Sequence, residues 1–256
     1  MIAQINELSA LDGICGGHVS ELIKAYASAY GFGYDFCRFY AISDNNLAVG
    51  EVCILNSSML VSFSDNAPLS AAAEAAELTV MLSPSEITVE NGADMASRLV
   101  SDYSVSPLCH FDITAAHAFH SPDCLETNPQ LDAVWRIASG AFDIADYSLW
   151  YTNSSHLRRH GVADFFVYKG ASCLRALRTE RNRVYFSDIA TMDICRGRGY
   201  AEEMISAAVD IYRRKNNCCY LLSDTATASY YKKLGFTENE HGRYLGLSAA
   251  ENGERE

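Results

Sequence analysis

The feature that most constrains the fold is a glycine-rich turn at residues 195–201, which reads CRGRGYA. Residues 184–192 before it are rich in β-branched and aromatic side chains, which favours a strand. After it, apolar residues recur at helical spacing as far as Tyr212. A helix that starts after such a turn offers unpaired N–H groups and the positive end of its dipole, which favour a bound phosphate. The sequence therefore predicts a phosphate-binding strand–turn–helix unit, with glycines that serve backbone geometry alone as the alternative.

The residues of the turn narrow the kind of phosphate site. Gly197 and Gly199 allow the backbone to approach a ligand closely, and Arg196 and Arg198 add positive charge. No Gly-Lys-Ser/Thr follows, so the turn is not a Walker loop. A dinucleotide fingerprint needs a third glycine where Glu202 stands. The turn fits neither of these two nucleotide motifs.

A second motif, YYKKLGF at residues 230–236, follows further along the chain. In this order and spacing, the two motifs resemble those of the GNAT superfamily of acyl-CoA-dependent N-acyltransferases. The family pattern is R/Q-x-x-G-x-G/A after a central strand, then a helix that ends in Y-x-x-L-G-F. The matching residues here are Arg196, Gly199 and Ala201 for the first motif, and Tyr231, Leu234, Gly235 and Phe236 for the second.

The resemblance spans residues 128–248 and implies an α/β (α+β) fold with a mixed, mostly antiparallel central sheet flanked by helices. The apolar periodicity of this half predicts the same order of elements. We expect helices at residues 131–142, 146–159, 200–214 and 226–234, and strands at 164–168, 172–177, 184–192, 218–222 and 244–247.

The N-terminal half, residues 1–120, is predicted to be a second α/β domain. We expect helices at residues 19–30, 69–78 and 92–101, and strands at 36–42, 47–56, 59–63 and 87–89. This order also opens a GNAT unit, although neither motif is repeated. A degenerate copy of the fold and an unrelated accessory domain both stay open.

The linker and the tail complete the predicted organisation. Prolines within residues 105–129 place the domain boundary there, so that a catalytic domain covers residues 128–248. The polar residues 249–256 are predicted to form a flexible tail.

The composition limits which classes of function and which cellular compartment we expect. The net charge of −12 argues against non-specific nucleic-acid binding, and it suits either an attraction for cationic amines or simple solubility. The nine cysteines show no C-x-x-C spacing, which indicates free thiols in a reducing, cytoplasmic setting. No signal peptide, membrane-spanning run or metal-ligand pattern is evident.

The resemblance implies roles for individual residues in holding acetyl-CoA. The diphosphate would lie on residues 196–201, mostly on their main chain, and the pantetheine arm would pair with the end of the central strand. Asp224 stands where relatives often have an asparagine that touches this arm, and Asp193 stands at a usual proline position. The expected cofactor-binding residues are Ala190, Thr191, Met192, Arg196, Gly197, Arg198, Gly199, Tyr200, Ala201 and Asp224.

Two residues are candidates for catalysis. Tyr231 aligns with the tyrosine that protonates the leaving thiolate in many relatives, and its alternative is a core tyrosine. Asp188 lies where the family often has an acidic residue, so it is the candidate general base, with a strand-end hydrogen-bond acceptor as the alternative.

The predicted function is acetyl-CoA-dependent N-acetylation of a small molecule or a peptide by direct attack of a primary amine on the thioester, without a metal. The alternative is a non-catalytic acyl-CoA-binding protein, a sensor or structural element, with the same fold. The acceptor and the oligomeric state, including a homodimer, stay open.

Overall fold

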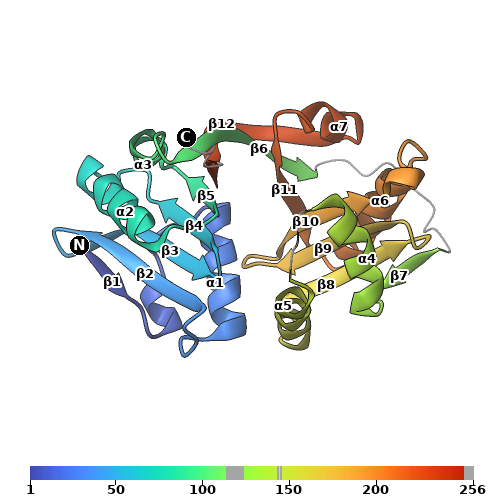
Figure 1. The fold of residues 1–256 in the computed structure, drawn as a ribbon, viewed down its shortest axis with the longest axis horizontal. Helices are drawn as coiled ribbons and strands as arrows, with labels where there is room; N and C mark the ends of the chain where they lie inside the picture. The colour runs from blue at the N-terminus through green and yellow to red at the C-terminus, as the bar shows by residue number, and fades with distance from the viewer. Residues whose placement is uncertain (114–123, 143, 145, 251–256) are drawn as a thin grey trace, which may run out of the picture. The chain divides into compact units, whose positions relative to one another are not determined.

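The computed structural model describes residues 1–113, 124–142, 144 and 146–250, and it divides the chain into two compact units (Figure 1). Unit 1 comprises Met1–Cys109 and Glu240–Glu256, and unit 2 comprises His110–Asn239. These units differ from the predicted ranges, because the boundary falls at Cys109 and the chain returns to unit 1 after Asn239. The predicted flexible tail lies outside the described residues beyond position 250.

Unit 1 is built on strands β1 to β5. Its elements are β1 (Ile2–Gln4), α1 (His18–Tyr30), β2 (Cys37–Asp44), β3 (Leu47–Leu55), β4 (Ser58–Phe63), α2 (Leu69–Leu82), β5 (Glu86–Glu90) and α3 (Ala93–Arg98). Strands β1 to β4 pair in sequence order and antiparallel, whereas β4 and β5 are parallel. The hairpin between β2 and β3 turns at Asn45 and Asn46, both with positive φ, as a tight hairpin requires.

The strand that follows β5 in the sheet comes from much later in the chain. Strand β12 (Phe236–Ala249) pairs antiparallel with β5 through residues 244–248. Strand β6 (Tyr103–Ile113) is its next neighbour in the sheet, and both strands have residues in the two units. Unit 1 is therefore assembled from two separate stretches of the chain.

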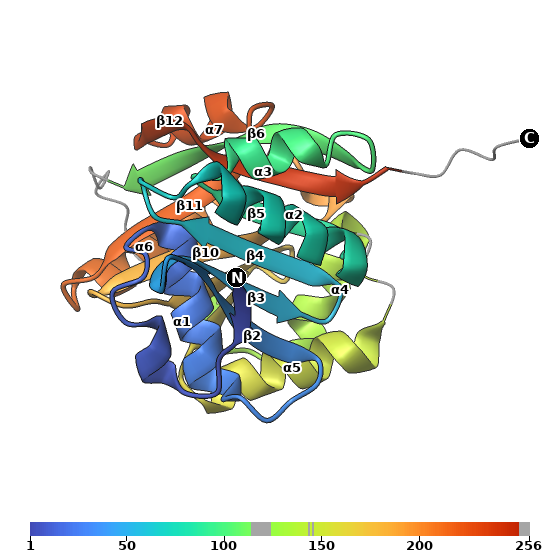
Figure 2. The ribbon, with the colours of Figure 1, turned by 90° about the vertical axis from the view of Figure 1, so that its left-hand side faces the viewer.

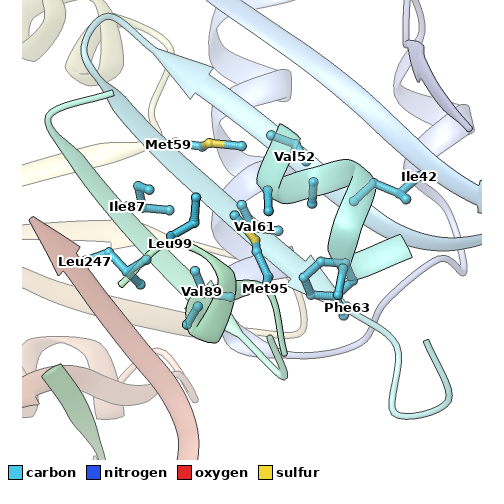
Figure 3. Packing of buried hydrophobic residues seen from close by; sticks show 14 of the residues in the cluster. Ile42, Val52, Met59, Val61, Phe63, Ile87, Val89, Met95, Leu99 and Leu247 are labelled. Atoms are coloured by element: carbon cyan, nitrogen blue, oxygen red, sulfur yellow. The ribbon is translucent and has the colours of Figure 1, made fainter. Parts of the chain in front are cut away.

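Helices cover both faces of the sheet of unit 1, α1 on one side and α2 with α3 on the other (Figure 2). Small residues of α2, among them Ala71 and Ala75, let this helix lie close to the strands. The aliphatic side chains of the strands fill the space beneath α2 and α3 (Figure 3). The core cluster includes Ile42, Val52, Met59, Val61, Phe63, Ile87, Val89, Met95, Leu99 and Leu247.

Unit 2 has the order of elements that the sequence predicts from residue 131 onward. An additional strand, β7 (Leu125–Thr127), precedes them, and the elements that follow are α4 (Leu131–Ala141), α5 (Tyr147–Arg159), β8 (Ala163–Tyr168), β9 (Ser172–Arg178), β10 (Arg183–Thr191), α6 (Tyr200–Arg213), β11 (Cys218–Asp224) and α7 (Ala228–Lys233). The sheet runs β7-β8-β9-β10-β11-β6. Neighbours from β7 to β10 are antiparallel, and β10 and β11 are parallel.

The helices of unit 2 also lie on both faces of their sheet. Phe165 contacts Trp150 of α5, whereas the next residue, Phe166, contacts Tyr212 of α6, and successive strand residues point to opposite faces. The Tyr212 hydroxyl donates to Asp164 at 2.6 Å, which fixes the C-terminal end of α6 on the sheet.

The first division between the units, at Cys109 and His110, lies within the predicted boundary at residues 105–129, but the prediction that Pro107 interrupts secondary structure was wrong. Pro107 lies inside β6, because a proline keeps an extended φ and loses only one donor, so it does not end the strand. None of the helices in the described part of the chain has the length and apolar character of a membrane span. All nine cysteines are free thiols.

Candidate active site

Strands β10 and β11 part from each other in the middle of the sheet of unit 2. Their ladder runs only from Arg183 and Cys218 to Tyr185 and Tyr220. Strand β10 nevertheless continues to Thr191 and β11 to Asp224. Beyond Tyr185, the facing edges of the two strands therefore leave backbone groups outside the ladder, where another extended chain can bind.

A bulge in β10 lies at the start of this opening. The register between β9 and β10 shifts between Ser187 and Ala190, and Asp188 has a positive φ of 51°. Beyond the bulge, the Met192 N–H donates to the Ala171 carbonyl at 2.9 Å, toward β9. Because strand N–H groups alternate in direction, the Thr191 N–H points to the opposite side, toward the opening.

The glycine turn connects β10 to α6 next to the opening. Gly197 and Gly199 have φ values of 76° and 77°, a region that residues with a side chain rarely adopt. Gly199 is the N-cap of α6 and supplies no side-chain cap for the N–H groups of the first turn. The Arg196 guanidinium contacts the Asp193 carboxylate at 2.8 Å, and both side chains are exposed. The turn thus presents mainly backbone donors.

A cavity of about 690 Å³ joins these features. It contains eight of the predicted site residues, namely Ala190, Thr191, Arg196, Gly197, Gly199, Tyr200, Ala201 and Tyr231. Four other predicted site residues, Asp188, Met192, Arg198 and Asp224, do not line it. The lining residues that the sequence did not single out are Ala141, Phe142, Ile189, Cys195, Glu202, Thr227 and Tyr230.

Little in the local sequence marks these additional lining residues as part of a site. Ala141 and Phe142 come from the end of α4, far from either motif in sequence, and only the packing of α4 across β8, β9 and β10 brings them to the cavity (Figure 1). Tyr230 and Thr227 flank Tyr231 on α7 and its N-cap, so the second motif was a clue to their position.

Tyr231 lies on the wall of the cavity formed by α7. Its side chain is half-buried, with its ring against Phe111 and Phe236. Burial, with smaller contributions from Tyr230 and Asp224, raises the pKa of Tyr231 to about 12. Burial and Glu202 likewise raise the pKa of Tyr230 to about 12. Both phenols therefore carry their protons at neutral pH and can donate them.

The Asp224 side chain accepts hydrogen bonds at the start of α7. Its carboxylate accepts from the Thr227 N–H at 2.7 Å and from the Thr227 hydroxyl at 3.0 Å. These contacts are typical of a side chain that stabilises the beginning of a helix. In the structure, Asp224 thus supports the helix that carries Tyr231.

Asp188 lies beside the cavity rather than on its wall. Its carboxylate contacts the guanidinium of Arg175 on β9, with Nη2 to Oδ1 and Nε to Oδ2 both at 3.2 Å. Both side chains are largely shielded from solvent, at 27% and 21% exposure. The sequence analysis did not single out Arg175.

Residues 161–238 match the family model described as Acetyltransferase (GNAT) domain. A search of curated proteins gave no match. Among solved structures, the chain is similar to a Drosophila protein with a TM-score of 0.62 and 12% identity, over 97% of this chain and 98% of that one. It is also similar to a GCN5-related N-acetyltransferase from Sphaerobacter thermophilus, with a TM-score of 0.58 and 14% identity, over 89% and 84% of the two chains.

A tandem GNAT protein from the clavulanic acid biosynthesis pathway aligns with 98% of this chain and 99% of its own, with a TM-score of 0.57 and 11% identity. At these identities the structures establish the fold, and the aligned length includes both units. Residues 161–238 therefore match a GNAT acetyltransferase domain, and the chain shares the fold of solved GNAT structures along most of its length.

Proposed function

We propose that unit 2 transfers an acetyl group from acetyl-CoA to a primary amine of a small molecule or a peptide. The observation that carries this proposal is the cavity in which the open edge of β10, the glycine turn and Tyr231 meet. Each of the three meets one requirement of the reaction. The edge of β10 offers hydrogen bonds to the pantetheine arm of the donor, the glycine turn binds its diphosphate, and Tyr231 gives a proton to its sulfur.

The donor fits the cavity by its chemistry. The first turn of α6 and the glycine turn offer N–H groups and a positive dipole to the diphosphate. The pantetheine arm carries two amides, which suit the unpaired edge of β10 at Thr191. The guanidinium of Arg196 is already matched by Asp193, so the backbone contributes more to this grip than the arginine does.

The chemical step then proceeds by direct attack. The neutral amine nitrogen bonds to the thioester carbon, the carbon–sulfur bond breaks, and the Tyr231 phenol gives its proton to the leaving sulfur. The nitrogen loses its extra proton to solvent water, and solvent returns a proton to the Tyr231 phenolate. A backbone N–H of β10 directed at the developing oxyanion contributes about 3 kcal/mol to lowering the barrier. At pH 7, deprotonating an α-amine of pKa near 8 costs about 1.4 kcal/mol, against roughly 4.6 kcal/mol for a lysine-like amine.

Replacement of Tyr231 by phenylalanine tests this proposal. The variant keeps the ring packing against Phe111 and Phe236 but loses the proton, so we expect kcat to fall by roughly 100-fold. Its affinity for coenzyme A should change by less than about 3-fold, because no hydrogen bond to the diphosphate is lost. The measurements are thiol release from acetyl-CoA over a panel of amines, amino acids and peptides, and calorimetric titration with coenzyme A.

The matched control is Tyr230→Phe, which removes the neighbouring phenol from the same helix and should reduce kcat much less. Coenzyme A binding without turnover on any acceptor would instead favour a non-catalytic acyl-CoA-binding protein. An absence of coenzyme A binding would contradict both functions.

We infer that unit 1 provides no second donor site of this kind. Strands β4 and β5 stay paired from Ser58 and Glu86 to Ser62 and Glu90, so no opening separates them. The turn from β4 to α2, residues 64–68, has no glycine, and its Asp65 accepts from Asn91. The buried carboxylate of Glu90 accepts from the His18 and Val19 N–H groups at 3.1 and 3.2 Å, so these donors at the start of α1 are already used.

Calorimetric titration of the intact chain with coenzyme A should therefore give one bound molecule per chain. The variant Gly199→Val should bind that molecule roughly 30- to 100-fold more weakly, since the glycine turn at the donor site of unit 2 is altered. A stoichiometry of two, or binding of one molecule by that variant with wild-type affinity, would contradict a single donor site.

A further inference from the structure

An ion pair across two strands holds the bulge of β10. Arg175 lies on β9 directly opposite Ser187, the last paired residue before the bulge. Its guanidinium donates from Nη2 to the Asp188 carboxylate at 3.2 Å and from Nε to the Ser187 hydroxyl at 3.0 Å. One arginine therefore binds two successive side chains at the point where the strand changes register.

The backbone of the bulge is also held on the side of β9. The Cys173 thiol donates to the Asp188 carbonyl at 3.7 Å. Asp188 itself has a φ of 51°, which a residue with a side chain adopts only at some cost, although Asp and Asn tolerate it best. The ion pair with Arg175 supplies the interaction that offsets this cost.

The shape of the bulge decides which backbone groups reach the cavity. Ile189, inside the bulge, and Ala190 and Thr191, just after it, all line the cavity, whereas Asp188 does not. Relaxation of Asp188 to a negative φ would restore the regular alternation of β10 and redirect the groups that follow. The contact between Arg175 and Asp188 thus lies outside the cavity and controls its wall.

We propose that Arg175 and Asp188 form a positioning pair that fixes the β10 bulge, and that Asp188 does not act as the general base. This proposal rests on the proposed function, because the bulge matters through the thioester that it orients. A base must accept a proton from the amine, but the carboxylate of Asp188 accepts from a guanidinium instead. Protonation of this carboxylate would sacrifice the ion pair that holds the bulge.

Three variants and one control test the pair. Asp188→Asn keeps a side chain that tolerates positive φ and removes the charge, Arg175→Gln removes the other partner, and the third variant combines both. The matched control is Arg178→Gln, because Arg178 lies three residues further along β9 and pairs with Asp164 at 2.6 Å, away from the bulge. The readouts are kcat, KM, the pH dependence of kcat/KM, and amide hydrogen exchange of residues 187–191.

If the pair positions the bulge, both single variants should lower kcat to a similar degree, by roughly 10- to 100-fold. The double variant should fall no further than the lower single variant, because the two residues act as a unit. The acidic limb of the pH profile should keep its position in every variant. Amide exchange at residues 187–191 should accelerate in all three variants and stay unchanged in Arg178→Gln.

A general base predicts a different pattern. In that case Asp188→Asn would have a much lower kcat, and its pH profile of kcat/KM would no longer show the acidic limb. Arg175→Gln would keep the wild-type kcat, and the acidic limb of its profile would shift to higher pH. That pattern, or unchanged amide exchange in all three variants, would overturn the proposal. If the wild-type chain acetylates no amine but exchange still accelerates in the three variants, the proposed function fails and the positioning pair stands.

Discussion

Replacing Gly199 by valine is expected to weaken coenzyme A binding by roughly 30- to 100-fold, from about 2 to 3 kcal/mol of strain that binding must restore. Gly199 has a φ of 77° at the N-cap of α6, and a β-branched residue is a steric outlier there. In the free variant the turn relaxes, so its N–H groups no longer converge on the diphosphate. Calorimetric titration measures the loss directly.

The matched control for this variant is Gly161→Val. Gly161 lies between α5 and β8 with a φ of 71°, so valine introduces a similar strain in the same unit but outside the cavity. Both variants should lose similar thermal stability, and only Gly199→Val should lose coenzyme A binding. Arg196→Ala should weaken binding only a few-fold, because Asp193 already matches this charge. Wild-type affinity in Gly199→Val would contradict a donor seat on this turn.

A chain that ends at Asn239 is expected to lose the folded state of unit 1. It lacks the second half of β12, which pairs with β5 and buries Tyr244 and Leu247 completely in the core. It also lacks Arg243, whose guanidinium approaches the buried carboxylate of Glu90 at 3.4 Å. Leaving a buried charge without its partner strongly destabilises the folded state. An unpaired strand edge also exposes backbone groups that can pair with other chains.

Circular dichroism and thermal melting should report this loss as a reduced folded fraction or as aggregation. A milder variant, Leu247→Ala, removes only part of the core and should cost about 2 to 5 kcal/mol of unfolding free energy. Ser248→Ala, on the same strand with an exposed side chain, is the control and should be near neutral. A truncated chain that melts like the full-length protein would show that unit 1 is complete without β12.

Features written in local sequence were predictable. The strand–turn–helix unit around residues 195–201 follows from residue type and periodicity, and nearly all helices of both units lie within a few residues of their predicted positions. The resemblance to the family's second motif drew attention to Tyr231, and the structure places it on α7, which is followed by Gly235 with a positive φ.

Features that depend on distant partners were not predictable in the same way. The residues near Asp188 in sequence do not predict the bulge, because Arg175, which binds Asp188, lies on another strand. Asp224 stands where relatives often have an asparagine, and only the structure shows that its carboxylate accepts a hydrogen bond from the Thr227 N–H. Strand β12 has residues in both units and pairs with β5, which lies far away in sequence. Side-chain periodicity does not predict such long-range pairing.

The two-part construction of unit 1 also determines the order in which the protein can mature during translation. The ribosome makes β5 before any residue of unit 2 and makes the β12 residues that pair with it only afterwards. The nascent chain must therefore carry an exposed β5 edge while all of unit 2 is synthesised, a state open to wrong pairing and to chaperone binding. The unit whose synthesis begins first is thus the one that finishes folding last.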